Sequence, residues 1–147
     1  MKTVFYWSPC LTKVGTLKST INSAISLSNY SNKEYKVKII NACGEWDEYL
    51  EILKKNKIDV ITFKFNFFSY LPKNGFLKSR ISYLIIILFS FFPLLNILRK
   101  EKPEFIIMHL ITSLPMILNN LFNFKTKFIL RISGYPKLNF FRKFFWE

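Results

Sequence analysis

Histidine, cysteine and glycine are scarce in this sequence, and each scarcity excludes a class of site. Two cysteines among 147 residues are too few for a disulfide scaffold or a cysteine-based metal site. Cys10 and Cys43 each follow a predicted strand, and we expect both to be free cytosolic thiols. The four glycines form neither a Walker loop nor a dinucleotide-binding fingerprint. The single histidine, His109, cannot be assembled with other residues into a Ser-His-Asp triad or a metal cluster, so no metal is expected.

Acidic residues are also few, and they are unevenly distributed. The chain has 22 Lys and Arg against 9 Asp and Glu, a net charge of +13. Residues 1–51 carry six lysines and five acids, whereas residues 52–147 carry sixteen basic residues and four acids. A basic, apolar second half favours an anionic partner such as a membrane surface, a phosphate-bearing substrate or nucleic acid. The alternative is that lysine, the default surface residue, only keeps an apolar fold soluble.

Apolar and aromatic residues, by contrast, are abundant. Half of the residues are hydrophobic and 18% are aromatic, which excludes an intrinsically disordered chain. The length is that of one domain, which we assign to residues 1–147. The apolar run near the N-terminus, Val4–Trp7, is shorter than the roughly 7–15 residues of a secretory signal. We therefore expect a cytoplasmic protein.

Apolar runs typical of buried strands alternate along the chain with segments typical of amphipathic helices. The predicted strands are Val4–Trp7, Tyr35–Ala42, the runs that begin after Lys57 and after Lys102, and Lys127–Ile132. The predicted helices are Leu17–Leu27, a segment that begins near Glu45 and ends near Lys57, the region Ile81–Leu98, and Leu114–Phe122. This alternation predicts an α/β fold with a Rossmann-like, doubly wound parallel sheet of about five or more strands.

One segment, Ile81–Leu98, is apolar enough to raise the question of a membrane span. It runs for 18 residues without a charge, between two pairs of basic residues. Pro93 is expected to interrupt a helix there, and the symmetric basic flanks favour neither orientation in a membrane. A span would also separate the last two strands from the first three. We favour a helix that packs on the sheet and touches the bilayer interface, rather than one that is fully buried.

Basic residues flank this segment and recur among aromatic residues near the C-terminus. Residues 140–146 read Phe-Phe-Arg-Lys-Phe-Phe-Trp, a pattern of interfacial amphipathic helices and of proteins that bind single-stranded nucleic acid. We prefer the membrane interpretation and do not expect nucleic acid as a partner. The residues expected to contact an anionic membrane surface are Lys78, Arg80, Arg99, Lys100, Arg142 and Lys143.

Ligands of an open parallel sheet bind beyond the carboxyl ends of its strands. The loops expected there are Ser8–Thr16, Ala42–Trp46, Phe65–Ser69, His109–Ser113 and Ser133–Lys137. In the first of them Gly15 leads into a helix whose free amides can bind an anion together with Lys13 and Thr16, although an ordinary turn has the same pattern. His109 follows the predicted fourth strand and is either a structural, hydrogen-bonded residue or a catalytic one.

Three segments carry a further pattern. Phe5–Leu17 contains the glycine loop before the first helix, and Pro103–Leu118 begins with a Pro-acid-apolar strand entry that ends in histidine. Phe128–Trp146 contains the most distinctive motif, Arg131-Ile132-Ser133-Gly134-Tyr135-Pro136. Together with the long basic and apolar helix region, this order of elements resembles the N-terminal domain of family 4 glycosyltransferases, over nearly the whole chain. Those enzymes have the two-domain GT-B fold.

The resemblance implies a transferase that moves a sugar from a nucleotide-sugar donor to a polysaccharide or lipid-linked acceptor, in cell-envelope synthesis at the inner face of the membrane. In such enzymes the N-terminal domain receives the acceptor and the C-terminal domain holds the nucleotide sugar. No cofactor is implied beyond that donor substrate. The resemblance places Lys13, Gly15 and Thr16 near the donor phosphates, His109 on the acceptor side of the cleft, and Ser133, Gly134 and Tyr135 in an acceptor-side loop.

Two alternatives to a transferase domain remain open from the sequence. The sequence stops at Glu147 without candidate donor-site acids, so we expect a missing C-terminal domain and an inactive chain in isolation. A non-catalytic, basic module that binds anionic lipid would have the same charge distribution. A single-pass membrane protein would use Ile81–Leu98 as its span.

Overall fold

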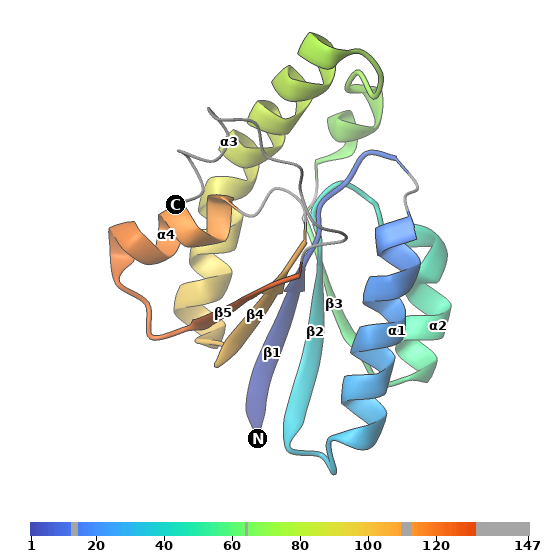
Figure 1. The fold of residues 1–147 in the computed structure, drawn as a ribbon, viewed down its shortest axis with the longest axis vertical. Coiled ribbons are helices and arrows are strands. Elements are labelled where there is room, and N and C mark those ends of the chain that lie inside the picture. Colours follow the sequence, from blue (N-terminus) through green and yellow to red (C-terminus); the bar gives the residue numbers. More distant parts are fainter. Residues whose placement is uncertain (13–14, 64, 110–112, 132–147) are drawn as a thin grey trace, which may run out of the picture.

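Five parallel strands form the centre of the fold (Figure 1). The computed structural model describes residues 1–12, 15–63, 65–109 and 113–131. The strands are β1 (Lys2–Trp7), β2 (Tyr35–Asn41), β3 (Asp59–Thr62), β4 (Phe105–Met108) and β5 (Lys127–Leu130). Their order in the sheet is β3-β2-β1-β4-β5, and every neighbouring pair is parallel. The predicted Rossmann-like parallel sheet is confirmed.

Helices cover both faces of this sheet. The helices are α1 (Gly15–Tyr30), α2 (Leu50–Lys55), α3 (Phe76–Glu101) and α4 (Ser113–Phe122), with short 3-10 turns at Asp47–Tyr49 and Asn66–Tyr70. Figure 1 shows α1 and α2 on one face and α3 and α4 on the other. This arrangement follows from the sequence because parallel strands need long crossover connections, and those connections are right-handed.

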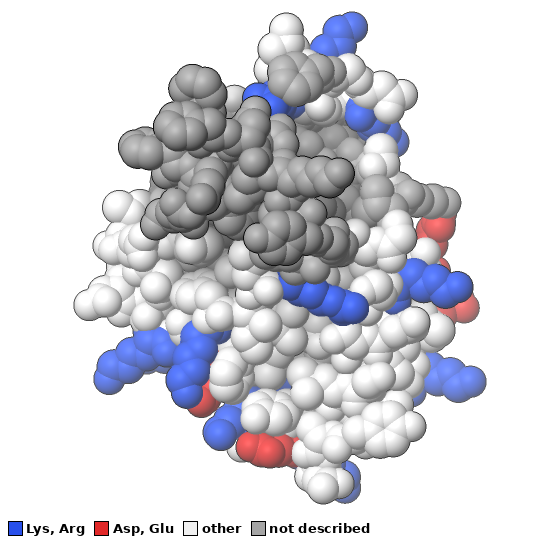
Figure 2. Space-filling model, in the orientation of Figure 1, with Lys and Arg blue, Asp and Glu red and all other residues white. Residues whose placement is uncertain are grey.

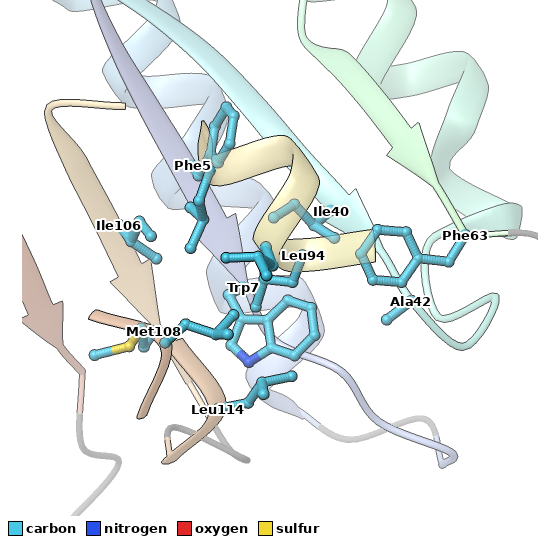
Figure 3. Close-up of a cluster of buried hydrophobic side chains, with 12 residues drawn as sticks. Phe5, Trp7, Ile40, Ala42, Phe63, Leu94, Ile106, Met108 and Leu114 are labelled. Atoms are coloured by element: carbon cyan, nitrogen blue, oxygen red, sulfur yellow. The ribbon is translucent and has the colours of Figure 1, made fainter. Parts of the chain in front are cut away.

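The side chains of β1 alternate between the two layers. Val4 and Tyr6 pack in the core beneath α1 and α2, whereas Phe5 and Trp7 pack in the core beneath α3 and α4. Trp7 is fully buried and its ring lies 6.3 Å from that of Phe63 (Figure 3). Strands buried on both faces read as continuous apolar runs, which is why β1 is recognisable in the sequence.

The C-terminal half of α3 is anchored in this core. Leu94, Leu95 and Leu98 are buried there. At the end of the helix, Glu101 Oε2 lies 2.8 Å from Lys38 Nζ on β2. Lys102 then ends α3 in the left-handed conformation, with φ 43°.

Two sequence expectations about helices are wrong. The segment near Glu45 does not begin a helix, because the α-helix there spans only Leu50–Lys55 after the 3-10 turn. Pro93 does not interrupt α3, which runs through it from Phe76 to Glu101. A proline inside a helix costs about 3 kcal/mol, but Phe91 before it and Leu94 after it both pack in the core beneath α3 and α4 and offset this cost.

Candidate functional site

The carboxyl ends of the five strands meet at one edge of the sheet, and ligands of open α/β sheets bind at this edge. The chain leaves β1 toward β2 on one side, whereas β4 and β5 lie on the other side of β1. The sheet order therefore reverses between β1 and β4. At such a reversal the loops diverge and leave a crevice, and the residues that follow β1 and β4 are the first candidates.

Ser8 and His109 are those residues. Trp7 pairs with Met108 in the register of β1 and β4, and the His109 amide donates to the Trp7 carbonyl at 2.9 Å. Ser8 is 0% exposed and His109 1%. Within the described part of the chain, Ser8 Oγ and His109 Nε2 have no hydrogen-bond partner. A buried polar group without a partner costs about 1–3 kcal/mol, so two such groups that follow neighbouring strands indicate a place for water or a ligand.

The environment of His109 favours its neutral form. Burial lowers the pKa of the imidazole below its ordinary value of 6.5, and the nearby positive charge of Arg131 lowers this pKa further. Arg131 follows β5, where its amide donates to the Met108 carbonyl at 3.0 Å. Its guanidinium Nη1 donates to the Ser19 carbonyl on α1 at 3.3 Å. A neutral imidazole can accept a hydrogen bond or a proton from a hydroxyl group.

On the other side of β1, the loop that follows β2 is held by side-chain hydrogen bonds. Asn41 is fully buried, and its Nδ2 donates to Asp47 Oδ1 at 2.7 Å. Its Oδ1 accepts from the Trp46 amide at 3.4 Å, and Trp46 Nε1 donates to the Ile40 carbonyl at 3.1 Å. Gly44 has φ +80°, and a Cβ there would lie 2.9 Å from Asp47 Oδ2. The turn therefore requires glycine at this position.

Glu45 holds the same loop through hydrogen bonds to its backbone. Its carboxylate accepts from the Cys43 amide at 2.6 Å and from the Ala42 amide at 3.2 Å. Burial raises the pKa of Glu45 to about 7, although these amides act to lower it, and the Asp47 carboxylate adds to the rise. Glu45 is consequently a carboxyl group that changes its charge near neutral pH.

A pocket of about 330 Å³ lies between the loops that follow β1 and β2, at the small end of the range for ligand pockets. Its lining residues come from both loops, from α1 and from the segment before α3. They are Cys10, Leu11, Thr12, Leu17, Cys43, Gly44, Glu45, Asp47, Glu48, Tyr49 and Lys73. The pocket is thus rich in carboxylates, in a chain whose net charge is +13.

Cys10 and Cys43 are free thiols, as predicted. Burial raises the pKa of Cys10 to about 12, and the Glu45 carboxylate contributes to the rise. Burial and Glu45 also raise the pKa of Cys43. Since the thiolate is the reactive form, neither cysteine is a nucleophile at neutral pH.

The residues predicted to bind the donor phosphates lie only partly within the described chain. Gly15 and Thr16 begin α1, and a Cβ at Gly15 would meet no heavy atom within 4 Å. The Thr16 carbonyl accepts from Thr20 Oγ1 at 2.8 Å inside the helix. Lys13 and the predicted acceptor-side residues Ser133, Gly134 and Tyr135 lie outside the described residues.

The structure separates the residues predicted to contact a membrane. Lys78 and Arg80 lie in the first turns of α3, and Arg99 and Lys100 in its last turn, roughly 30 Å away at 1.5 Å per residue. The guanidinium of Arg99 lies over the Phe122 ring at 4.7 Å. On the face seen in Figure 2, basic side chains are dispersed rather than gathered into one patch. Arg142 and Lys143 lie outside the described residues.

Sequence reasoning missed the roles of Glu45 and Arg131. Glu45 looked like a helix-capping acid because four acids, Glu45, Asp47, Glu48 and Glu51, crowd a short stretch. Arg131 was only part of a motif, since its place beside His109 depends on the pairing of β4 with β5. Among the described residues no group of three or more His, Cys, Asp or Glu side chains could hold a metal ion.

No protein-family model and no curated protein matches the sequence. The fold is similar to that of UGT73P12 from Glycyrrhiza uralensis, solved with glycyrrhetinic acid 3-O-monoglucuronide (TM-score 0.62, 12% identity, 91% of this chain covered). It is also similar to CalG4, the calicheamicin glycosyltransferase (TM-score 0.61, 10% identity, 98% covered).

Both of these structures are GT-B glycosyltransferases, so the fold is that of a Rossmann-like domain of the GT-B type. The match covers 28% of the UGT73P12 chain and 36% of the CalG4 chain. This chain therefore spans about a third of their length. At such identities the similarity concerns the fold and does not distinguish family 4 from other GT-B families.

Proposed function

We propose that this chain is the acceptor-side domain of a glycosyltransferase of family 4. Joined to a C-terminal domain that holds a nucleotide sugar, it transfers the sugar to a saccharide or lipid-linked acceptor. The fold shared with two glycosyltransferases supports this proposal. The observation that carries it is the pair of buried, unpartnered polar atoms, Ser8 Oγ and His109 Nε2, where the sheet order reverses.

The chemistry at this edge suits an acceptor hydroxyl group. His109 is neutral at pH 7 because burial and Arg131 lower its pKa, so its imidazole can accept the hydrogen of a sugar hydroxyl. Ser8 Oγ can donate to an oxygen of the same acceptor. The leaving nucleotide phosphate needs positive partners, and the N-terminus of α1 at Gly15 and Thr16 supplies backbone amides for it without a metal ion.

Because His109 is the only histidine, its imidazole gives a single set of NMR signals. We expect a titration midpoint below 6.5 in the 147-residue chain. Glycans and polyprenyl-phosphate sugars without a nucleotide serve as trial acceptors. We expect each acceptor that binds to shift the imidazole signals. Imidazole signals that stay unchanged with every acceptor that binds, as judged by ligand-observed NMR, would remove His109 from the site.

Transfer itself requires the donor-binding half. Fusion of this chain to the C-terminal domain of a GT-B glycosyltransferase is expected to give transfer of labelled sugar from a nucleotide donor to an acceptor. His109→Ala should reduce kcat/KM by at least about 100-fold, the usual contribution of a positioned acid–base group. Asn22→Ala, an exposed change on α1, should leave transfer unchanged. A fusion that folds and binds nucleotide sugar but transfers nothing would favour the non-catalytic alternative.

A further inference from the structure

The N-terminal half of α3 has its polar and apolar sides reversed relative to an ordinary surface helix. Ser82 and Ser90 are fully buried, although five apolar residues of the same helix segment are between 56% and 71% exposed. These five residues, which we term the outer stripe, are Leu77, Ile81, Leu84, Leu88 and Phe92. Their spacing of three or four residues places them on one side of the helix.

The buried serine hydroxyl at the start of α3 is turned toward the protein. Ser82 Oγ lies 2.7 Å from the Pro72 carbonyl and 3.1 Å from the Lys78 carbonyl. In this part of the helix, serine side chains therefore face the protein and apolar side chains face the solvent. Scattered exposed apolar residues are normal on soluble proteins, but a continuous stripe of this length indicates a contact surface.

The chain segment that contains the outer stripe is basic. Between Asp59 and Glu101 the sequence has no carboxylate, whereas Lys73, Lys78 and Arg80 lie at or just before the start of α3. Tyr70, 88% exposed, belongs to the adjoining 3-10 turn. Apolar residues with a tyrosine and cations at their border are the composition of segments that sit at the surface of an anionic bilayer.

Packing of α3 against the rest of the protein argues against a membrane span. Residues Leu77–Glu101 are long and apolar enough to cross a membrane, but a third of the most apolar window is buried in the protein. Leu94 and Leu98 are core residues beneath the sheet, and Phe89 packs on Phe67 at 4.9 Å between ring centroids. A span would pull Leu94 and Leu98 out of the core and separate Phe89 from Phe67. Figure 1 shows the first turns of α3 extending beyond the sheet.

We propose that the outer stripe is a membrane-docking surface that enters the interface of an anionic bilayer, with Lys78 and Arg80 on the lipid headgroups. The apolar side chains supply insertion, and the basic residues supply the preference for anionic lipid. The occupant is a lipid surface rather than another protein because the sequence between Asp59 and Glu101 contains no carboxylate and the five residues of the stripe are all apolar. This inference does not depend on sugar transfer.

Sedimentation with vesicles of phosphatidylcholine alone, or mixed with phosphatidylglycerol, tests the docking surface. The full chain should bind the mixed vesicles and bind the neutral ones far less. Leu84→Ser with Leu88→Ser should lower the partition coefficient by roughly tenfold or more, because two half-exposed leucines no longer enter the interface. The matched control is Leu50→Ser with Ile52→Ser, two exposed residues of α2 on the opposite face, and it should bind as the wild type.

The charge component is tested by a second pair of variants. Lys78→Gln with Arg80→Gln should weaken binding to the mixed vesicles by roughly fivefold for each basic residue and leave binding to neutral vesicles unchanged. Lys54→Gln with Lys55→Gln, in the last turn of α2, serves as control. Equal losses in both pairs would show attraction by net charge alone and would overturn a defined docking surface.

Insertion is tested by fluorescence. The fluorescence of the tryptophan introduced by Leu88→Trp should be quenched by lipids brominated on their acyl chains. The fluorescence of the tryptophan introduced by Ile52→Trp should not be quenched. Vesicle binding without quenching at position 88 would overturn insertion of the stripe. The alternative outcome is a chain that does not bind vesicles but forms dimers in analytical ultracentrifugation. If Leu84→Ser with Leu88→Ser dissociates those dimers, the stripe contacts a second copy of the chain and not a membrane. Circular dichroism of every variant checks that it is folded.

Discussion

The two sides of β1 differ at the carboxyl edge of the sheet. On the β2 side, the hydrogen bonds of Asn41 and Glu45 join the whole turn from Ala42 to Asp47. On the β4 side, Ser8 Oγ and His109 Nε2 belong to buried residues but have no hydrogen-bond partner within the described chain. A buried polar group without a partner lowers stability, so its presence at an edge that binds ligands points to function. The β2 side is structural, and the β4 side is the candidate binding site.

The largest effect is expected from Asn41→Ala on the structural side. The change leaves Asp47 Oδ1 and the Trp46 amide without their partner and should lower the free energy of unfolding by about 2–3 kcal/mol. Urea denaturation measures it. Asn22→Ala, an exposed asparagine of α1, should change stability by no more than about 0.5 kcal/mol. Equal effects of the two changes would mean that the β2 loop is not held by Asn41.

Glu45→Gln should reveal how ionisation of Glu45 affects the stability of the protein. A carboxyl whose pKa is raised to about 7 on folding favours the folded state fully at low pH, and this contribution is lost as pH rises from the unfolded value through 7. The stability of the variant relative to the wild type should therefore increase by about 2–3 kcal/mol between pH 5 and pH 8.

Urea denaturation of both proteins across this pH range gives that difference directly. Glu51→Gln, which replaces an exposed carboxyl of α2, controls for the loss of one negative charge and should give no such slope. A difference between Glu45→Gln and the wild type that does not change with pH would contradict a desolvated carboxylate, and the pocket beside it would then be open to water.

The architecture was predictable from the sequence because it depends on apolar runs and their alternation. The runs Val4–Trp7 and Tyr35–Ala42 match β1 and β2 within two residues at each end, since a strand buried on both faces cannot contain many polar side chains. The order of strands was not predictable, because it depends on which strands pair over long distances. The neighbours of His109 follow from that order.

The details of the site and of α3 depend on where individual side chains point. Hydropathy indicates that Ile81–Leu98 is apolar but not that Ser82 and Ser90 face inward while Leu84 and Leu88 face outward. Proline statistics predicted a break at Pro93, which packing of the flanking residues overrides. Glu45 was assigned to a helix from its neighbours in sequence, although its hydrogen bonds to Ala42 and Cys43 hold it in the loop.

On the open side, the pH dependence of His109 should have the opposite sign to that of Glu45. A histidine whose pKa is lowered on folding stabilises the folded state above its unfolded pKa of about 6.5, and this stability is lost as pH falls through that value. His109→Gln, which does not titrate, should lose less stability than the wild type between pH 7 and pH 5. An identical loss in both proteins would show that the imidazole is solvated and not buried in a binding site.

The smallest effect should come from Ser8→Ala, and its smallness is informative when set beside Ser23→Ala. Ser23 Oγ lies 3.0 Å from the buried Tyr6 hydroxyl, so its loss should lower the free energy of unfolding by about 0.5–1 kcal/mol, even after the higher helix propensity of alanine. Ser8 Oγ has no such partner, so its removal relieves the cost of an unsatisfied hydroxyl but leaves a small void. These two effects offset each other, and the free energy of unfolding should change by less than about 0.5 kcal/mol. Urea denaturation at pH 7 compares the two serines. If Ser8→Ala costs as much as Ser23→Ala, an ordered water already satisfies Ser8, and the distinction between a structural side and an open side of β1 fails at this residue.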